Sequence, residues 1–436
     1  MKRRFILALL FGWLTACSST GDSQPQPPVE SESPGPSVGE APPPATGSGD
    51  KWSLWTEGTT LRGANLWQRI VVPELDGTEF LGDGYIGPPW TQADFDGLAD
   101  AGANYVNLSV PGIFTMLPPY ALDERAQAHL DSLLEMAARA DLFAVISFRT
   151  GPGRSDFTFY RDGAGDWFDP ELLIESVWTD RAAQDAWVEM WRDTAERYRD
   201  NPVVAGYDLM VEPNSNEIVL DVYEPEEFYP DHAGELYDWN QLYPRLVAGI
   251  REVDDQTPIL VSAPGYGSVR WLSTLIPTDD PRTVYMVHQY APQAAYTHQG
   301  LPAENAYPSQ LDVDGDGSPE TFDRAWLEDY LGPIADFRDR HNVPVAVNEY
   351  GVERWAPGAA DFMADEIELF EQLGLNHSFW AWFPEWRPWS EGENSMNYLF
   401  GPDPENTAPV DNELFGVLTD AWGRNSLWPS TFGTGE

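Results

Sequence analysis

Cysteine and histidine are scarce in this sequence. Cys17 is the single cysteine among 436 residues, so neither a disulfide framework nor a zinc site built from cysteine ligands is available. The six histidines include no HExxH motif and no pair at the spacing of metal ligands, which disfavours a zinc hydrolase. No GxSxG stands between a strand-like and a helix-like segment, so a serine triad has no support either.

Positive charge is also scarce. The chain has 25 Lys and Arg against 71 Asp and Glu, which gives a formal net charge of -46, and the basic residues are nearly all arginine. A dense carboxylate surface repels nucleic acids and anionic membrane surfaces, so the sequence predicts no nucleic-acid partner. Two origins of the acidity stay open: a salt-rich source, or the ordinary acidity of extracellular proteins from high-GC genomes.

The one long apolar run at the amino terminus is too short to span a bilayer. Residues 1–17 begin with three basic residues and continue with an apolar run from Phe5 to Leu14, which predicts a secretory signal. The ending Leu-Thr-Ala-Cys resembles the lipobox of bacterial lipoproteins. This resemblance implies that Cys17 is lipidated and that the exported protein is held at the outer membrane or cell surface by a lipid anchor alone. A stray buried cysteine is the alternative.

Residues 18–50 have almost no large apolar side chain and consist mainly of Ser, Pro, Gly, Glu and Gln. Such a segment cannot bury enough surface to fold, so we expect a disordered linker. The remaining residues, 51–436, are long enough for one barrel with extended loops. The chain is 13% aromatic and has 19 Trp, which suits an aromatic-lined sugar cleft. We therefore expect 51–436 to form one catalytic domain.

Strand-like and helix-like segments alternate from Thr60 onward. Short, apolar, β-branched runs predict strands at residues 61–66, 105–110, 142–148, 203–210, 259–262, 284–288, 343–348 and 378–382. Helical periodicity is strongest at residues 123–140, 180–199, 241–253, 322–341 and 359–373. Eight strands alternating with helices favour a closed (β/α)8 barrel, the TIM barrel of the α/β class, over an open doubly wound sheet.

Two of the predicted strands lead into a glutamate. Glu212 follows the buried run in NPVVAGYDLMVEPN, and Glu349 ends the run in VPVAVNEYG. A parallel α/β barrel keeps its chemistry at the carboxyl ends of its strands. A retaining glycosidase needs one carboxyl group to protonate the leaving oxygen and another, roughly 5 to 5.5 Å away, to attack the anomeric carbon. The pair favours this reaction, although either glutamate alone could simply begin a loop.

The motifs at these strand ends resemble glycoside hydrolase family 5, the cellulase-like family. The resemblance covers nearly everything from about Leu61 onward, including the segment FDRAWLEDYLGPIADFRDRHNVPV. Its most specific parts are Glu212-Pro213, His288-x-Tyr290, Glu349 in NEYG, and the tryptophan-rich stretch SFWAWF.

The resemblance implies an activity and a role for each matched residue. It implies a retaining β-glycoside hydrolase that acts on a polysaccharide or oligosaccharide without a catalytic cofactor. Glu212 would be the acid/base and Glu349 the nucleophile. His288 and Tyr290 would orient and support the pair.

Substrate-binding residues are also implied, with three departures from the family. Trp382, with Trp380 beside it, would offer a platform for a sugar ring. The family usually has asparagine before the acid/base, arginine at the end of strand two and histidine at the end of strand three. Here those positions hold Val211, Asn107 and Arg149. Either Asn107 and Arg149 bind a different sugar, or the chain is a non-catalytic sugar-binding barrel at the cell surface.

The loop after the third predicted strand contains two arginines and several aromatic rings. Arg149 and Arg154 would lie near the catalytic face, with Phe157 and Phe159 close to them in sequence. Arginine pairs well with carboxylates and sulfates, so a uronate or sulfate on the sugar is one interpretation. The other is that these arginines balance local carboxylates of an acidic chain.

An acidic motif in the loop after the sixth predicted strand predicts a structural calcium site. The motif DVDGDGSPETFD places Asp312, Asp314 and Asp316 at positions one, three and five and Asp323 at position twelve, as in an EF-hand loop. Position twelve is aspartate instead of glutamate, and no helix clearly leads in. The alternative is an acidic turn that starts the helix predicted from Phe322.

Overall fold

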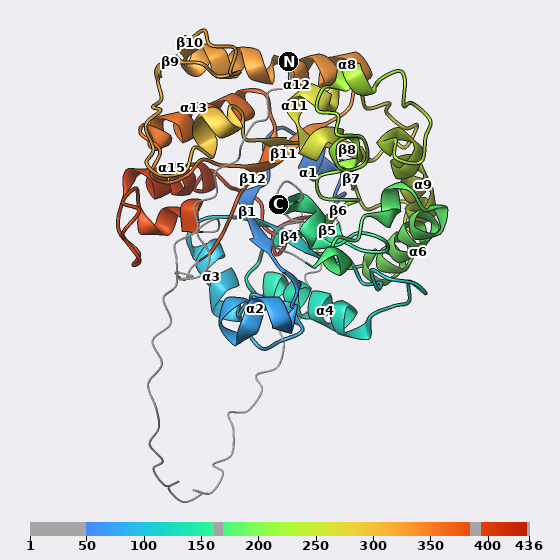
Figure 1. Cartoon of the computed structure of the whole chain (residues 1–436). Coiled ribbons are helices and arrows are strands. Elements are labelled where there is room, and N and C mark those ends of the chain that lie inside the picture. Colours follow the sequence, from blue (N-terminus) through green and yellow to red (C-terminus); the bar gives the residue numbers. More distant parts are fainter. Residues whose placement is uncertain (1–48, 161–168, 384–393, 434–436) are drawn as a thin grey trace, which may run out of the picture. The chain divides into compact units, whose positions relative to one another are not determined.

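The computed structural model describes residues 49–160, 169–383 and 394–433. Cys17 and most of the predicted linker lie outside these residues. Eight parallel strands close into a barrel in the order β1-β12-β11-β8-β7-β6-β5-β4, and helices surround it (Figure 1). The predicted TIM barrel is confirmed. The barrel strands are β1 (Arg62–Trp67), β4 (Tyr105–Pro111), β5 (Phe143–Thr150), β6 (Val204–Asp208), β7 (Ile259–Ser262), β8 (Thr283–Gln289), β11 (Val345–Tyr350) and β12 (Asn376–Phe379).

One helix of the surrounding ring follows each barrel strand. Their boundaries follow ordinary capping chemistry, as at α4, where the Asp123 carboxylate accepts hydrogen bonds from the backbone of Arg125 and Ala126. The ring consists of α3 (Gln92–Asp100), α4 (Glu124–Arg139), α6 (Arg181–Tyr198), α9 (Trp239–Arg251), α11 (Val269–Leu272), α12 (Arg324–His341), α13 (Ala359–Gln372) and α15 (Glu413–Trp422).

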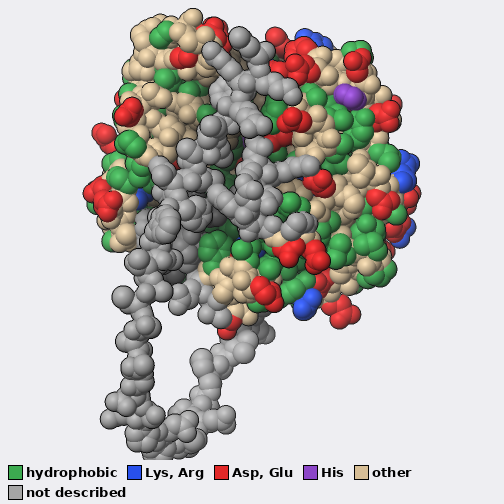
Figure 2. All heavy atoms as spheres, in the orientation of Figure 1, with side chains coloured by type: hydrophobic (Ala, Val, Ile, Leu, Met, Phe, Trp, Pro, Cys, Tyr) green, Lys and Arg blue, Asp and Glu red, His purple; other side chains and the backbone are tan. Residues whose placement is uncertain are grey.

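The remaining elements belong to the barrel floor and to the loops. They are α1 (Ser53–Thr56), β2 (Arg69–Ile70), α2 (Pro73–Phe80), β3 (Ile86–Gly87), the 3-10 helices at Asp156–Tyr160, Pro170–Leu172, Ser176–Trp178 and Tyr398–Phe400, α7 (Ser215–Leu220), α8 (Pro225–Phe228), α10 (Pro264–Gly267), the π-helix Gln293–Thr297, β9 (Ser309–Leu311) and β10 (Glu320–Phe322). No helix within the described ranges is long and apolar enough to cross a membrane. Acidic side chains are widespread on the face drawn in Figure 2, and basic ones are few.

Several predicted boundaries differ from the structure, and two of these differences have a clear cause. The last barrel strand ends at Phe379 instead of Trp382. Beyond it, the backbone amide of Trp380 donates a hydrogen bond to the Tyr350 carbonyl of β11, and that of Trp382 donates to the Asn65 carbonyl of β1. The chain after β12 therefore still contacts both neighbouring strands. The helix predicted from Phe322 begins later, because Phe322 still belongs to β10.

Apolar side chains from α1 close the amino-terminal end of the barrel. Leu54 and Trp55 are buried and pack in one cluster with residues at the beginnings of the strands, such as Leu61 and Phe143. The Trp55 indole donates a hydrogen bond to the carbonyl of Ala205 at 3.0 Å. This end is the floor of the barrel, so the opposite end, where the strands finish, is the open one.

A polar layer crosses the barrel between the floor and the open end. The Asn107 amide donates to Asn65 Oδ1 at 2.5 Å, and the Ser147 hydroxyl donates to Asn107 Oδ1 and to Asp208. Asn348 donates to Asp208 Oδ2 at 3.1 Å. Burial raises the pKa of Asp208 to about 6, although the bond from Ser147 opposes this. The layer lies directly below Glu349, the residue that follows Asn348.

Candidate active site

Adjacent strand ends bring the two predicted catalytic glutamates and a histidine together. Glu349 lies in β11, and its partner across the ladder with β8 is His288. Glu212 lies four residues beyond the end of β6. One carboxylate oxygen of each glutamate and one ring nitrogen of His288 all lie within 4.8 Å of one another. The barrel therefore gathers both carboxylates at its open end, as the sequence predicts.

His288 and Tyr290 hold the pair from the side of β8. His288 Nδ1 lies 2.9 Å from Glu212 Oε1 and 3.4 Å from Glu349 Oε2, so one imidazole contacts both carboxylates. The Tyr290 hydroxyl donates to Glu349 Oε2 at 3.1 Å. These contacts fit the orienting role that the sequence predicts for both residues.

Glu212 has an unusual backbone conformation. Its φ is 52°, in the left-handed region that a side chain with a Cβ adopts at a cost. The fully buried Arg154 guanidinium holds this turn, because it donates to the carbonyls of Val211 and Glu212, each at 2.7 Å. Burial and the charge of Arg149 lower the pKa of Arg154 to about 9. Arg154 therefore fixes the backbone that carries Glu212 and is not exposed to pair with a charged sugar.

The charges of the site are strongly coupled. Burial raises the pKa of Glu349 to about 7, against the charge of His288, and the charge of Glu212 adds to the rise. Burial opposes ionisation of Glu212 too, but the hydrogen bond and charge of His288 outweigh it and lower that pKa. Burial disfavours a charged His288, yet Glu349 and Glu212 raise its pKa. The two carboxylates therefore titrate as a pair that keeps one proton up to about pH 7.

Arg149 lies on the other side of Glu349. Its Nη1 is 4.0 Å from Glu349 Oε1, an oxygen that has no hydrogen-bond partner among the described residues. Its Nε donates to Asp156 Oδ1 at 3.0 Å. The guanidinium carbon lies 4.2 Å from the centre of the Phe159 ring and 5.5 Å from that of Trp380. Arg149 thus balances two local carboxylates, the second interpretation that the sequence leaves open.

A family model described as Cellulase (glycosyl hydrolase family 5) matches residues 62–385. The chain belongs to glycosyl hydrolase family 5.

Curated and solved relatives agree with this family. Endoglucanase C of Acetivibrio thermocellus is 24% identical over 353 residues, which cover 75% of this chain and 90% of that protein. A β-xylosidase of Phanerodontia chrysosporium is 23% identical over 225 residues, covering 49% and 40%. Endoglucanase Cel5A of Thermotoga maritima has the same fold, with a TM-score of 0.60 at 16% identity over 85% of this chain and 99% of that one.

The family and these relatives make the chain a glycosidase that hydrolyses the O-glycosyl bonds of β-glycosides. Family 5 glycosidases need no catalytic cofactor. The non-catalytic barrel has no support from any of these comparisons.

The other residues predicted to bind substrate differ in how exposed they are and in how close they lie to the glutamates. Trp382 is 5% exposed, its indole donates to the Asp94 carbonyl, and it packs against Trp422 of α15. Trp380 is only partly buried and lies beside Arg149. Asn107 is fully buried in the polar layer, with its amide bonded to other interior side chains. Of these residues, only Trp380 has an exposed part near the glutamates.

His298 lies beside Tyr290 and was not singled out in the sequence. It follows the π-helix Gln293–Thr297 in the loop after β8, and its ring meets that of Tyr290 edge-on, with centres 5.1 Å apart. Burial lowers the pKa of His298 to about 4, so the imidazole is neutral at working pH, with Glu212 near enough to oppose this. No motif marks it, because it lies in an irregular loop. Its place beside Tyr290 comes from the fold.

The acidic loop of this family 5 chain connects β9 to β10. Oxygens of Asp312, Asp314 and Glu320 lie within 4.8 Å of one another. Asp323 instead caps α12, where its carboxylate accepts from the backbone amides of Ala325 and Trp326. The oxygens that approach one another in this loop therefore include that of Glu320, whereas the spacing had suggested Asp323. Asp316 accepts from the backbone of the following turn.

Proposed function

We propose that the enzyme is a retaining β-glycoside hydrolase acting on a polysaccharide or its oligosaccharides, with Glu212 as acid/base and Glu349 as nucleophile. The observation that carries this proposal is the approach of both carboxylates to one imidazole, within 4.8 Å. Two carboxyl groups this close leave no room for a water between them and the sugar, which favours direct attack by a carboxylate.

The reaction takes two displacements. Glu349 attacks the anomeric carbon while the Glu212 carboxyl protonates the departing glycosidic oxygen, which gives a glycosyl ester and a free alcohol. Glu212 then removes a proton from water, which attacks the same carbon and releases Glu349. The shared proton must start on Glu212. A glycosidic oxygen lying against that carboxyl accepts a hydrogen bond only from its protonated form, which leaves Glu349 as the anion beside Arg149 and Tyr290.

We propose Trp380 as the sugar platform, in place of the more deeply buried Trp382. Sugars bind to exposed aromatic faces, and Trp380 lies at the mouth near Glu349. The backbone substrate that we propose is a β-linked glucan or mannan. Its support is the endoglucanase name of the relatives, together with Thermotoga maritima Cel5A structures titled as complexes with cellobiose and with mannotriose.

The configuration of the first product tests this function. We expect NMR spectra recorded within minutes of mixing enzyme and cello-oligosaccharide or manno-oligosaccharide to show the β anomer first, followed by slow mutarotation. Appearance of the α anomer first would refute the double displacement and the roles of both glutamates.

The shared proton predicts a dependence on pH. We expect kcat/KM to fall above about pH 7, where the pair loses its last proton.

The same pKa predicts how the free energy of unfolding depends on pH. Because the pKa of Glu349 in the folded state lies above its usual 4.5, its burial in the protonated form contributes fully to stability below pH 4.5. That contribution is lost as the pH rises towards 7. Unfolding by urea at several pH values should show a decline of up to about 3 kcal/mol over this range. Asp208, with its pKa raised to about 6, adds to the decline at lower pH, so Glu349→Gln should reduce it mainly between about pH 6 and 7. An unchanged slope in that interval would contradict the assignment.

We also propose that the β9–β10 loop binds calcium through Asp312, Asp314 and Glu320. Because a ligand that binds only the folded state stabilises it, millimolar calcium should raise the Tm relative to chelator at constant ionic strength. Asp314→Asn should abolish this response. Asp323→Asn should lower the Tm equally in both conditions, because Asp323 caps α12. A wild-type Tm that is the same in calcium and in chelator would refute the proposed calcium site.

We also propose that the protein is exported and held at the membrane by a lipid attached to Cys17. The lipobox-like sequence that ends at Cys17 supports this proposal. In a bacterial host that processes lipoproteins, the wild-type chain should sediment with membranes, whereas Cys17→Ser should be recovered in the soluble fraction with its activity intact. Equal partitioning of both proteins would exclude the anchor.

A further inference from the structure

The ladder between β11 and β8 has one extra residue on the side of β11. Val347 pairs with Val287. The next paired residue of β11 is Glu349, which faces His288. The ladder therefore skips Asn348, which is the extra residue of a β-bulge. Bulges next to active sites re-aim a side chain, so this one bears on Glu349.

The bulge decides which face of the strand carries Glu349. Side chains alternate between the two faces of a strand. Val347 packs in the apolar core shared with the helices, and Asn348 lies in the polar layer inside the barrel. In an uninterrupted ladder, Glu349 would pair with Gln289 and face the helices. Instead it faces the interior, as Asn348 does, and meets the imidazole of His288.

The backbone of the bulge is held by Asn65 of β1. The Asn65 amide donates to the Asn348 carbonyl at 2.8 Å, although β12 lies between their strands in the barrel. A carbonyl in a regular ladder points to the neighbouring strand, so the Asn348 carbonyl has turned into the barrel. The Asn107 amide donates to Asn65 Oδ1, which leaves the amino group of Asn65 to face β11 and, at 3.1 Å, Ser378 Oγ of β12.

The side chain of the bulge residue is held at both ends. The Tyr105 hydroxyl donates to Asn348 Oδ1 at 3.0 Å, and the Asn348 amide donates to Asp208 Oδ2 at 3.1 Å. Asn348, Tyr105 and Asn65 are all buried, so bulk water cannot replace a lost partner. Because a buried polar atom without a partner is costly, these bonds favour a single conformation of the bulge.

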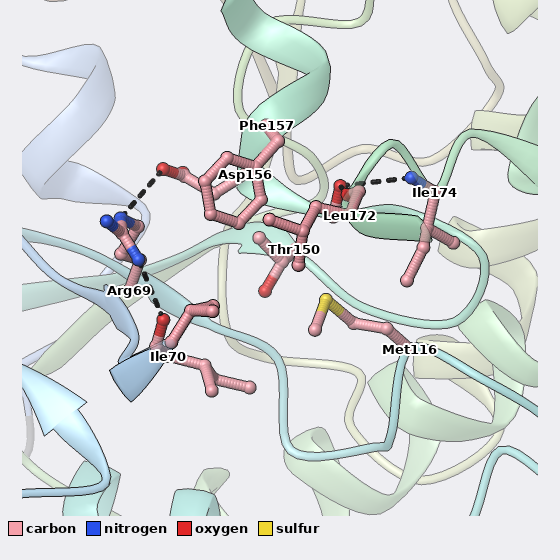
Figure 3. Close-up of a pocket in the computed structure, with 10 residues that line it drawn as sticks. Arg69, Ile70, Met116, Thr150, Asp156, Phe157, Leu172 and Ile174 are labelled. Atoms are coloured by element: carbon pink, nitrogen blue, oxygen red, sulfur yellow. Dashed lines mark hydrogen bonds and ion pairs between the residues drawn. The ribbon is translucent and has the colours of Figure 1, made fainter. Parts of the chain in front are cut away.

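Contacts at the mouth reach Glu349 only because the bulge has turned it inward. Arg149 Nη1 lies 4.0 Å from Glu349 Oε1, and Arg149 is itself held by Asp156 at 3.0 Å. Figure 3 shows the Asp156 carboxylate towards its other neighbour, the Arg69 guanidinium, at 4.0 Å. These side chains orient the carboxylate of Glu349, whereas the bulge sets the position of the backbone that carries it.

We propose that Asn65 and Tyr105 are positioning residues for the proposed nucleophile, Glu349. They hold the bulge at Asn348, and the bulge turns the glutamate into the mouth of the barrel. The inference rests on the proposed double displacement. Both residues are buried below Glu349, in or next to the polar layer, so they act through it and not on the sugar. A loosened bulge should therefore lower kcat and leave KM nearly unchanged.

A trapping reagent measures the reactivity of Glu349 directly. The reagent is a 2-deoxy-2-fluoro-β-cellobioside or β-mannobioside with a dinitrophenolate leaving group. The Glu349 carboxylate forms an ester with the anomeric carbon as the bond to the phenolate breaks, and the fluorine slows hydrolysis of that ester. Phenolate release gives the rate, and mass spectrometry of the peptide that contains Glu349 gives the position of the ester.

Two variants should slow this labelling. Tyr105→Phe removes the hydroxyl that meets Asn348, and we expect the maximal rate of ester formation to fall about tenfold. Asn65→Ala removes the donor that holds the Asn348 carbonyl, and we expect a fall of about a hundredfold. In both variants the reagent should bind as well as it does to the wild type.

Tyr207→Phe is the matched control. The Tyr207 hydroxyl is also buried and donates to Asp254 at 3.0 Å, away from the bulge. Both tyrosine variants lose a buried hydrogen bond and should have a lower Tm, but only Tyr105→Phe should be labelled more slowly. Equal maximal labelling rates in these two variants would overturn this inference and leave the glycosidase function standing.

The remaining outcomes are distinguishable. A folded Asn65→Ala variant that is labelled at the wild-type rate would also overturn the inference. If Asn65→Ala fails to fold, the comparison of Tyr105→Phe with Tyr207→Phe is the test. A wild-type enzyme that cleaves its chain and is never labelled at Glu349 would refute the proposed role of that residue, and the inference with it.

Discussion

Replacing either glutamate of the proposed catalytic pair by glutamine should reduce turnover by several orders of magnitude and leave the fold intact. In the proposed mechanism, Glu349→Gln removes the attacking carboxylate and Glu212→Gln removes the proton donor, so each loses a contact made in the transition state. Glutamine has nearly the same shape, and both side chains lie at a solvent-facing end of the barrel. Initial rates on an oligosaccharide and thermal melting of each variant provide the measurement.

A matched control and a chemical rescue separate the two roles. Glu366 in α13 is also buried, and burial raises its pKa well above 4.5, which favours the neutral form that glutamine imitates, so Glu366→Gln should keep near wild-type rates. With an activated aryl β-glycoside, azide should enter the space left by Glu349→Gly and give the α-glycosyl azide. In Glu212→Gly it should attack the glycosyl ester and give the β form. Interchanged products would reverse the roles assigned here.

His288→Ala should lower kcat by about a hundredfold with little change in KM. The imidazole contacts both carboxylates at once, and a displacement of reacting groups by about 1 Å costs roughly this much. Its raised pKa also favours a positive charge beside both glutamates. Because a cation lowers the pKa of nearby carboxyl groups, its removal should shift the basic limb of the pH–rate profile upward.

His377 provides the comparison for this variant. It is equally buried, lies near the beginning of β12, and accepts or donates one hydrogen bond with the Tyr350 hydroxyl at 2.8 Å. His377→Ala should lower the Tm, since a buried hydrogen bond is lost, while the pH–rate profile keeps its position. A profile that moves in both variants, or in neither, would show that His288 is only structural.

The barrel was predictable because its strands are buried on both faces. Several of them, such as β7 and β8, are short apolar runs that stand out from amphipathic helices such as α4, and the order of the runs indicates a parallel barrel. That Glu212 and Glu349 come together at the open end was predictable for a related reason. A glutamate ending such a run, as Glu349 does, faces the open end of any barrel of this kind.

Other features depended on contacts that sequence spacing does not encode. Asp323 could have been a metal ligand or a helix cap, since aspartate serves well in both, and only the position of α12 decides. The apolar run SFWAWF continues past the last paired residue, so hydrophobicity misplaced the strand end and made Trp382 look as accessible as Trp380. Arg154 lies 58 residues before Glu212, and its hydrogen bond to that carbonyl appears only in the folded chain.

The position of α1 shows at which end of the barrel the amino-terminal segment joins the folded domain. The folded domain begins at the floor of the barrel, where Asp50 pairs with Arg282 and Lys51 donates to the Asn201 carbonyl. A chain anchored through Cys17 would be held at this floor by a leash of about 3 Å per residue at full extension. The glutamates lie at the opposite end of the barrel, so a tether attached at the floor would not block the entry of a polymer.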